Sequence, residues 1–278
     1  MVKQTFIKWG AVLLLLVAQA SMAKTYTFGV VPQQSASKLA QLWTPIVLHL
    51  SGQTGLEIKF ATAPNIPTFE KRLAAGDYDF AYMNPYHFTV FNQEPGYHAL
   101  AKAKNKRIKG IIVVRKDSGI TELKQLNRQT LAFPAPAAFA ASILPRSHLS
   151  EIGVDFTAKY VSSHDSVYST VAKGLYPAGG GVMRTFNNMP DTVRKQLHVL
   201  WTTQGYTPHA FAAHPKVNAA DQRKLQQALT RMDSSLNGMA LLESIKLQGI
   251  ESAQSGDWDD VRRLRIELLD DLVHPQAE

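Results

Sequence analysis

The apolar residues of this chain follow two spacings. Residues 26–31 and 79–83 form short apolar runs without polar alternation, which is typical of strands buried on both faces. Residues 37–50 instead repeat apolar positions at helical spacing, and glycines follow at 52 and 55. The same criteria predict further strands at 56–61, 99–103, 110–115, 130–133, 159–161, 179–182 and 198–202, and further helices at 68–75, 86–93, 123–126, 137–153 and 166–173. This alternation predicts an α/β fold with mostly parallel sheets flanked by helices.

The strand and helix alternation runs twice along the chain. The second round begins after residue 114, and no low-complexity linker separates it from the first. Two successive α/β units of this kind predict two lobes packed face to face.

The last part of the chain, residues 218–274, has an almost wholly helical pattern. Its apolar stripe consists of Leu225, Leu229, Met232, Leu236, Met239 and Leu242. We expect this stretch to return to the first lobe, so that the chain crosses between lobes twice and forms a hinge and a cleft. The predicted division is 24–114 with 206–278 as lobe 1, and 115–205 as lobe 2.

The N-terminal residues have the pattern of an export signal. Lys3 and Lys8 precede an apolar run at 11–17, and small residues stand at Ser21 and Ala23. The run is far shorter than the roughly 20 residues that span a bilayer. We therefore predict a signal peptide over 1–23, cleavage before residue 24, a periplasmic mature protein and no membrane insertion after cleavage.

Composition excludes several kinds of site. The chain has no cysteine, which removes disulfides, lipid attachment at a cysteine and thiolate metal sites. The formal net charge of +8 favours anionic solutes weakly. The one tight basic cluster, 102–109, contains no aromatic residue and is interpreted as a solvated loop between strands, so no nucleic acid partner is expected.

Enzyme motifs are missing from the sequence. Its nine histidines form no HExxH pair, no G-x-S-x-G segment occurs, and no glycine-rich phosphate loop precedes a helix. The glycines at 179–181 are better explained by close approach of another segment to a strand. We expect no catalytic residue, no metal and no cofactor; an enzyme remains the rival hypothesis, and hydrolysis or group transfer by the purified protein would establish it.

Several short motifs, in this order and spacing, resemble a known family over nearly the whole mature chain. They are Gly29-Val30-Val31-Pro32, Leu42-Trp43-Thr44-Pro45, the segment 76–82 leading to Asn84-Pro85, the segment 113–120, Ser162-Ser163-His164-Asp165, and Trp201. The chain resembles the phosphate, phosphite and phosphonate substrate-binding proteins of ABC importers. The resemblance implies the two-lobed type II periplasmic binding protein fold.

The resemblance also implies where a ligand would bind. An oxyanion is expected between the lobes at the start of the helix near Ala137, where N–H groups and the helix dipole favour negative charge. This chain has Ala138-Phe139-Ala140 where relatives have Ser-Thr-Ser, so the side-chain hydroxyl donors are missing.

Two more departures change the expected ligand. Ile66 stands where the family has a ligand-facing tyrosine, and Pro177 precedes Ala178 where an aspartate is usual. No acidic side chain lies at 207–210 to pair with a substrate ammonium. An aminoalkyl phosphonate is therefore not expected; the hypothesis is a small anionic solute with one oxyanion head and an apolar or aromatic body.

Ten residues are the resulting candidates for ligand contact. They are Gln33, Tyr82, Asn84, Tyr86, Ala137, Ala138, Phe139, Ala140, His164 and His209. Alternatives stay open: Tyr82 equally fits a core aromatic, and Asn84 and Tyr86 equally fit a helix start. Asp165, beside His164, fits a helix cap.

The partner is an ABC permease or, alternatively, a sensor histidine kinase. Both would respond to closure of the lobes over the ligand, and a single sequence does not separate them. We predict a monomer whose lobes close about the hinge when the ligand binds.

Overall fold

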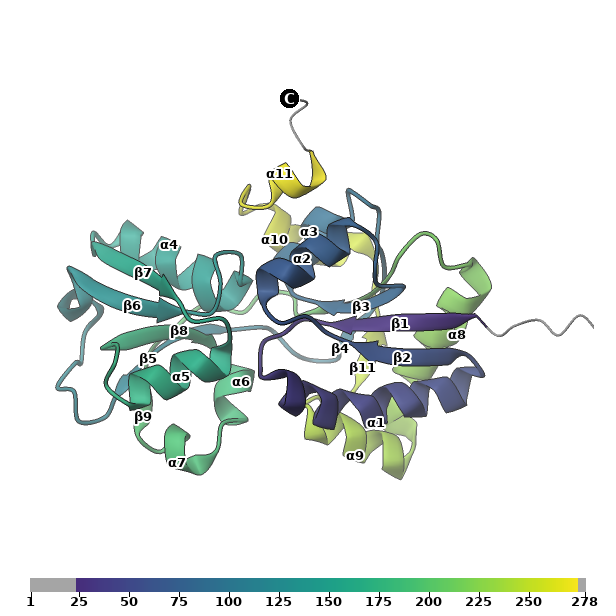
Figure 1. Ribbon diagram of the computed structural model, residues 1–278, viewed down its shortest axis with the longest axis horizontal. Coiled ribbons are helices and arrows are strands. Elements are labelled where there is room, and N and C mark those ends of the chain that lie inside the picture. The colour runs from purple at the N-terminus through teal and green to yellow at the C-terminus, as the bar shows by residue number, and fades with distance from the viewer. Residues whose placement is uncertain (1–23, 275–278) are drawn as a thin grey trace, which may run out of the picture.

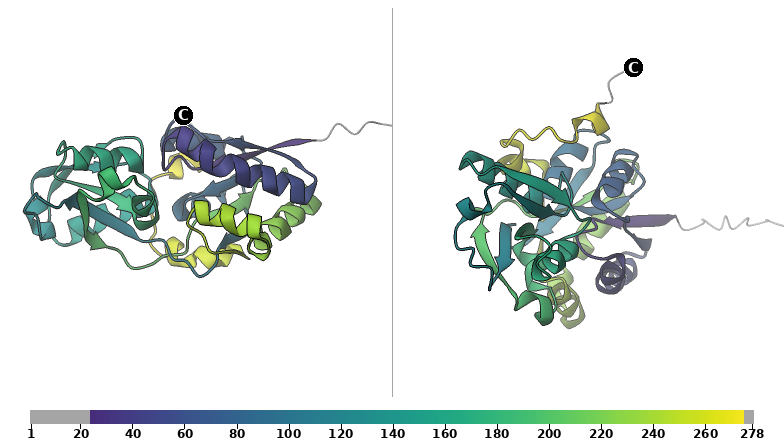
Figure 2. Two further views of the ribbon diagram at one scale, coloured as in Figure 1. Left: turned by 90° about the horizontal axis from the view of Figure 1, so that it is seen from below. Right: turned by 60° about the vertical axis from the view of Figure 1, so that its left-hand side comes forward.

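Two lobes lie side by side in the computed structural model, which describes residues 24–274 (Figures 1 and 2). Each lobe has its own sheet with helices on both faces, so the predicted α/β, two-lobed architecture is confirmed. The predicted signal peptide, 1–23, lies outside the described residues. Within 24–274, no helix is long and apolar enough to cross a bilayer.

Lobe 1 is built on a six-stranded sheet of order β11-β4-β10-β3-β1-β2. β1 pairs in parallel with β2 and β3, whereas β10 and β4 pair antiparallel with their neighbours. The sheet is therefore mixed and not mostly parallel as predicted. Its strands are β1 (Thr25–Val30), β2 (Glu57–Ala61), β3 (Phe80–Met83), β4 (His98–Ala103), β10 (Ala210–Ala213) and β11 (Ile250–Ser252).

Helices cover both faces of this sheet. One face carries α1 (Ala36–Thr54), α8 (Ala219–Thr230) and α9 (Leu236–Ser244); the other carries α2 (Ile66–Ala74), α3 (Pro85–Phe91), α10 (Asp259–Arg262) and α11 (Asp270–Val273). The apolar positions predicted within residues 37–50 form the buried face of α1. Gly55 ends that helix with a positive φ of 68°. The short 3-10 turns Met232–Ser234 and Ser255–Trp258 complete this lobe.

Lobe 2 is built on a five-stranded mixed sheet of order β7-β6-β8-β5-β9. α5, α6 and α7 cover one face, and α4 covers the other, each over its own apolar core. The elements are β5 (Gly110–Arg115), a 3-10 turn at Leu123–Leu126, β6 (Gln129–Phe133), α4 (Leu144–Glu151), β7 (Phe156–Tyr160), α5 (His164–Ala172), β8 (Ala178–Val182), α6 (Met183–Asn187), α7 (Asp191–Arg194) and β9 (Leu197–Thr202).

The chain crosses between the lobes at residues 104–109 and 203–209. Here Ile108 and Tyr206 pair through two backbone hydrogen bonds of 2.8 and 3.0 Å. The predicted double crossing is therefore present. The predicted boundary after residue 114 is wrong, because β5 pairs with β8 and β9 of lobe 2. The sequence did not reveal this, since an all-apolar strand fits the interior of either sheet equally well.

The C-terminal stretch also differs from its prediction. β11 interrupts the expected run of helices and extends the lobe 1 sheet beside β4. Leu236 and Met239 of the predicted stripe are exposed, at 84% and 44%, because α9 buries only part of one side against α1. β10 was not predicted, since its sequence Ala210–Ala213 has no β-branched residue.

Candidate functional site

A small closed cavity lies between the lobes, where the chain leaves β6 and enters the following helix. Its volume is about 10 Å³, room for about one water, so the lobes are closed over it. Lobe 1 and the first crossing contribute Val31, Gln33, Ile66, Asn84 and Ile108, and lobe 2 contributes Ala138, Phe139, Ala140, Ala141, His164 and Val182.

The helix at this cavity does not begin with α-helical geometry. Phe139–Ile143 forms a π-helical turn that continues into α4, although the sequence pattern predicted one helix over 137–153. Pro145 has no N–H to donate to Ala141 O, and Leu144 N donates to Phe139 O instead of Ala140 O. The Ala140 carbonyl is therefore released from the usual helical hydrogen bond, and the Ala141 carbonyl lacks its usual donor at position 145.

Three amide groups of this turn are free to bind an anion. Within residues 24–274, the N–H groups of Phe139, Ala140 and Ala141 have no hydrogen-bond acceptor, whereas the next amide, Ser142 N, donates to Ala138 O at 2.7 Å. Free amides at a helix start are the donors that oxyanions use. The turn can supply them without the hydroxyls that the sequence lacks.

Two glycines let this turn sit close to the sheet of lobe 2. A Cβ atom at Gly110 would lie 2.0 Å from Ala140 O, and one at Gly180 would lie 2.0 Å from Ala141 O. No real side chain tolerates such a distance. The prediction that the glycine run 179–181 permits close approach is confirmed, and the approaching segment at Gly180 is the candidate binding turn.

His164 joins the two lobes at the cavity. Its backbone N–H donates to Gln33 O at 2.9 Å, and its Nδ1 lies 2.9 Å from Thr185 Oγ1. Burial, with a smaller contribution from the Arg184 charge, lowers the pKa of His164 to about 3. The imidazole is therefore neutral at physiological pH and contributes hydrogen bonding rather than charge.

Asn84 makes a second link between the lobes. Its Oδ1 accepts from His87 N at 2.8 Å at the start of α3, while its Nδ2 donates to Ala137 O at 3.4 Å. The sequence left two roles open for Asn84, a helix cap and a residue of the cavity wall. In the structure its side chain has both roles.

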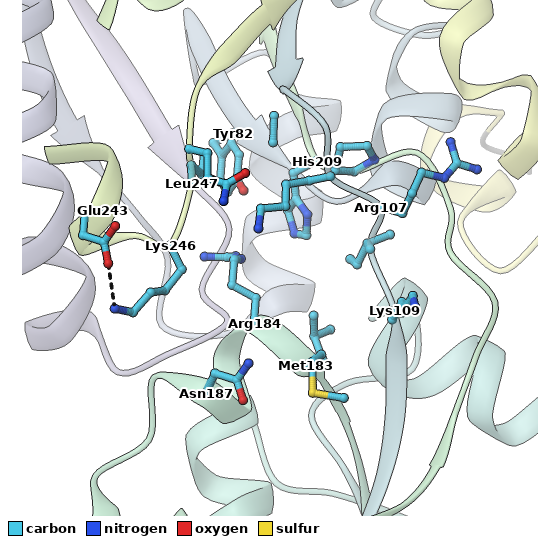
Figure 3. Close-up of a pocket in the computed structure, with 16 residues that line it drawn as sticks. Tyr82, Arg107, Lys109, Met183, Arg184, Asn187, His209, Glu243, Lys246 and Leu247 are labelled. Atoms are coloured by element: carbon cyan, nitrogen blue, oxygen red, sulfur yellow. Dashed lines mark hydrogen bonds and ion pairs between the residues drawn. The ribbon is translucent and has the colours of Figure 1, made fainter. Parts of the chain in front are cut away.

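A larger cavity of about 400 Å³ adjoins the small one, and Ile108 and Val182 belong to both walls. Tyr82 and His209 line it, stacked on each other with ring centroids 4.9 Å apart. The remaining lining residues are Ala103, Lys106, Arg107, Lys109, Met183, Arg184, Asn187, Pro208, Glu243, Lys246, Leu247 and Gln248 (Figure 3).

Arg184 is the main residue of this region that the sequence did not reveal. It follows β8 in α6 and reaches across to lobe 1, where its guanidinium donates to Gln33 Oε1 at 2.8 Å and Ile245 O at 3.5 Å. No motif marks this position, because a single arginine after a strand has no distinctive spacing. The basic cluster at 102–109 begins in β4 and continues as the predicted loop at 104–109, which is the first crossing and also forms part of the cavity wall.

Eight of the ten candidates line these cavities, and a ninth, Ala137, is hydrogen-bonded to a lining residue. Six line the small cavity: Gln33, Asn84, Ala138, Phe139, Ala140 and His164. Tyr82 and His209 line the larger one, and Ala137 contacts Asn84 through its carbonyl. Tyr86 lines neither: it is buried in lobe 1, where its hydroxyl accepts from Leu269 N at 2.9 Å, so the expected cleft position of Tyr86 is not observed.

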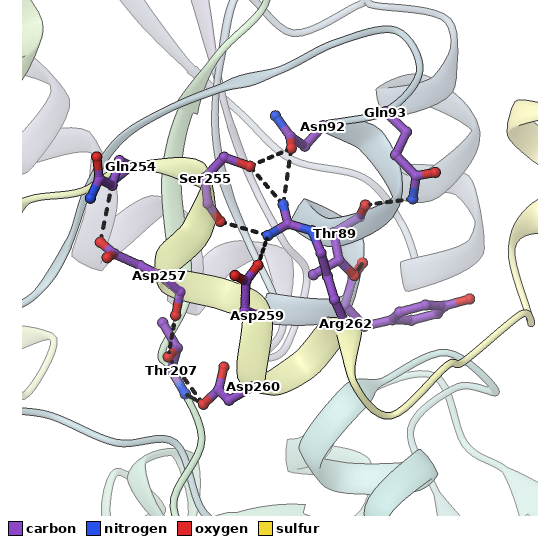
Figure 4. A network of polar contacts seen from close by, with 11 residues as sticks. Thr89, Asn92, Gln93, Thr207, Gln254, Ser255, Asp257, Asp259, Asp260 and Arg262 are labelled. Carbon is purple, nitrogen blue, oxygen red and sulfur yellow. Dashed lines mark hydrogen bonds and ion pairs between the residues drawn. The ribbon is translucent and has the colours of Figure 1, made fainter.

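A carboxylate fixes the two crossings at the back of the cleft. Asp260 Oδ2 accepts from Thr207 N at 2.8 Å and Thr207 Oγ1 at 3.1 Å (Figure 4). It also accepts from Arg107 Nη2 at 2.7 Å. Thr207 lies on the second crossing and Arg107 on the first. Asp260 therefore ties both hinge segments to α10.

We expect Asp260→Ala to lower the free energy of unfolding by about 1–3 kcal/mol, because it leaves the Thr207 amide without its acceptor and removes the charged partner of the Arg107 guanidinium. Urea unfolding measures the loss. Asp259→Ala is the matched control: this neighbouring carboxylate is 57% exposed and pairs only at the surface with Arg262, an interaction worth about 0–1 kcal/mol. Equal losses in the two variants would contradict a special role for Asp260.

Comparisons with known proteins match this architecture. A model of the family described as the periplasmic phosphonate substrate-binding protein of ABC transporters matches residues 28–258. The phosphate-import protein PhnD of Mycolicibacterium smegmatis is 24% identical over 225 residues, covering 69% of this chain and 66% of the relative. The tetrathionate sensor histidine kinase TtrS of Salmonella typhimurium is 24% identical over 240 residues, covering 77% of this chain and 40% of the relative. The chain thus spans less than two thirds of either relative.

Solved structures share the fold at lower identity. PhnD1 from Prochlorococcus marinus, in complex with methylphosphonate, superposes with a TM-score of 0.80 at 19% identity, covering 87% of this chain and 97% of that one. A binding component of a phosphonate ABC transporter from Pseudomonas aeruginosa superposes with a TM-score of 0.81 at 15% identity, covering 87% of this chain and 85% of that one. The fold is that of type II periplasmic binding proteins, as predicted. The chain belongs to the family of periplasmic substrate-binding proteins of phosphonate ABC transporters.

Proposed function

We propose that this protein captures one small anionic solute between its lobes and presents it to an ABC permease. The observation that carries the proposal is the set of free amides at Phe139, Ala140 and Ala141, three residues that line a cavity walled by both lobes. The Arg184 guanidinium, which is hydrogen-bonded to Gln33 of the cavity wall, supplies positive charge nearby.

The three free amides lie together on one turn, which favours a ligand with a single oxyanion group at this site. Phe139 and Ile66 make part of the wall apolar, and an oxyanion oxygen buried without a donor would cost about 1–3 kcal/mol. A phosphonate head with an organic substituent matches this combination of amides and apolar surface in its chemistry. The cavity, which has room for about one water, would have to widen to admit it. Methylphosphonate is the ligand of PhnD1 in its solved structure, which makes it a suitable first probe.

Capture would proceed by hinge closure. The contacts of His164 with Gln33, Asn84 with Ala137, and Arg184 with Gln33 all join the two lobes and can form only when they are closed. A ligand that bridges the lobes shifts the population toward this closed state. The permease would then recognise the closed surface, and this cycle requires no chemical step.

The alternative partner, a sensor histidine kinase, has less support. The similarity to TtrS shows that such a domain also occurs in a sensor protein. The family model and the import protein PhnD both describe transport components. Permease and ATPase genes beside the gene for this chain would support uptake, whereas a neighbouring histidine kinase gene would support sensing.

Thermal unfolding with and without ligand tests the proposal. Methylphosphonate at 100 times its Kd is expected to stabilise the protein by about 2.7 kcal/mol, with a corresponding rise in Tm. Its neutral dimethyl ester lacks the charge, is larger by two methyl groups, and is expected to give no rise. A response to the ester equal to that of the anion, or tight binding of inorganic phosphate alone, would contradict the proposed ligand class.

A further inference from the structure

The larger cavity lies directly beside the proposed head site. Gln33 lines the small cavity, and its Oε1 accepts from Arg184, which lines the larger one. The two spaces also share Ile108 and Val182 in their walls. A volume of about 400 Å³ is within the range of small-molecule sites, so the proposed ligand has room to extend beyond its oxyanion head.

Positive charge dominates the wall of this larger cavity. Lys106, Arg107, Lys109, Arg184 and Lys246 line it, and Glu243 is its one carboxylate. Glu243 Oε1 lies 3.5 Å from Lys246 Nζ, so this carboxylate already has a positively charged partner. Arg184 donates only to neutral oxygens, and no carboxylate within residues 24–274 lies within 4.0 Å of its nitrogens.

His209 adds a hydrogen-bonding group that has no partner. Its side chain is buried with 3% exposure, it lines the cavity, and its Nε2 has no hydrogen-bond partner in the described part of the chain. Burial, followed by the Arg184 charge, holds the pKa of His209 well below its usual value, so the ring is neutral. A buried polar atom of this kind is normally satisfied, and a ligand oxygen would satisfy it. Figure 3 shows Arg184 reaching into the space between Lys246 and His209.

We infer that the larger cavity is a second anion subsite and that the ligand is a short organic dianion. One end is the oxyanion head at the amides of residues 139–141; the other is a second acidic group held by Arg184 and His209. This inference rests on the proposed function and narrows its ligand class. It replaces the expectation of an apolar or aromatic body with one of an acidic tail.

Arg184 could instead serve only to hold the lobes together through Gln33. The two roles have different consequences for ligands. A purely structural arginine would support all ligands of the head site equally, whereas a second subsite would favour a ligand with a second charge. A pair of ligands that differ only in that charge separates them.

The test uses 3-phosphonopropionate and propylphosphonate, which share a phosphonate head and a three-carbon chain. Titration calorimetry is expected to show the carboxylated ligand binding at least about tenfold more tightly to the wild-type protein. In Arg184→Met the ratio of the two affinities is expected to fall to within about twofold. Arg223→Met, at an exposed position on α8, is the control and should retain the wild-type ratio.

A second variant covers the case in which Arg184→Met fails to fold. His209→Phe keeps an aromatic ring against Tyr82 but removes Nε2, and it should lower the same ratio. Equal affinities in the wild type, or an unchanged ratio in the folded variants, would overturn the second subsite alone. If neither phosphonate binds, the proposed function is contradicted and the inference falls with it.

Discussion

Gly180→Ala is expected to weaken ligand binding at least about tenfold and to lower the free energy of unfolding by about 1–3 kcal/mol. The added Cβ would lie 2.0 Å from Ala141 O and 2.7 Å from the Phe133 ring. Both neighbours are fixed, one in the candidate binding turn and one in the adjacent strand β6. To avoid the clash with the new Cβ, the turn must move away from β8. This movement displaces the amides that we propose bind the anion.

Calorimetry with methylphosphonate and urea unfolding measure the two effects of Gly180→Ala. Gly52→Ala is the matched control, because a Cβ at this position in α1 meets nothing within 4 Å. That variant is expected to bind normally and to be more stable by up to about 1 kcal/mol, since alanine favours the helix. Unchanged affinity in Gly180→Ala would mean that the position of the turn does not control binding.

The protein is expected to lose stability steeply between pH 7 and pH 5 because two histidines are buried without charge. The pKa of His164 is about 3 in the folded protein and about 6.5 in the unfolded chain, and that of His209 is lowered in the same direction. Between these values the unfolded chain binds more protons, so the free energy of unfolding falls as the pH falls. His164 contributes a loss of about 2 kcal/mol from pH 7 to pH 5, and His209 adds to the loss in the same direction.

Urea unfolding at pH 7, 6 and 5 measures this dependence. His164→Asn is expected to reduce the slope of stability against pH by about the contribution of one histidine, whatever its own cost at pH 7. His98→Gln, at an exposed position of β4, is the control and should keep the wild-type slope. A slope unchanged in His164→Asn would show that this histidine is not buried neutral.

The sequence predicted most elements of the fold because their burial follows simple rules. α1 has one apolar face, and β3 is buried at all four positions, so spacing alone identified both. The pattern did not reveal β10, in which three of the four residues are alanine and none is β-branched, or the sheet to which β5 belongs. Pairing between distant strands is a tertiary property that local apolar spacing does not determine.

The candidate site was predicted in part for a similar reason. The turn at 137–140 follows a strand and begins a helix, a local arrangement that the resemblance placed at the ligand. The larger cavity combines residues 106–109, 183–187, 208–209 and 243–248, which approach one another only when both crossings are formed. Arg184 therefore acquires its neighbours from the fold, and its sequence context contains no sign of them.

The crystal structure of the protein with bound methylphosphonate tests the central claim most directly. We predict phosphonate oxygens within hydrogen-bond distance of the amides of Phe139, Ala140 and Ala141, with both lobes contacting the ligand. A phosphonate bound elsewhere, with these three amides facing away from it, would contradict the account.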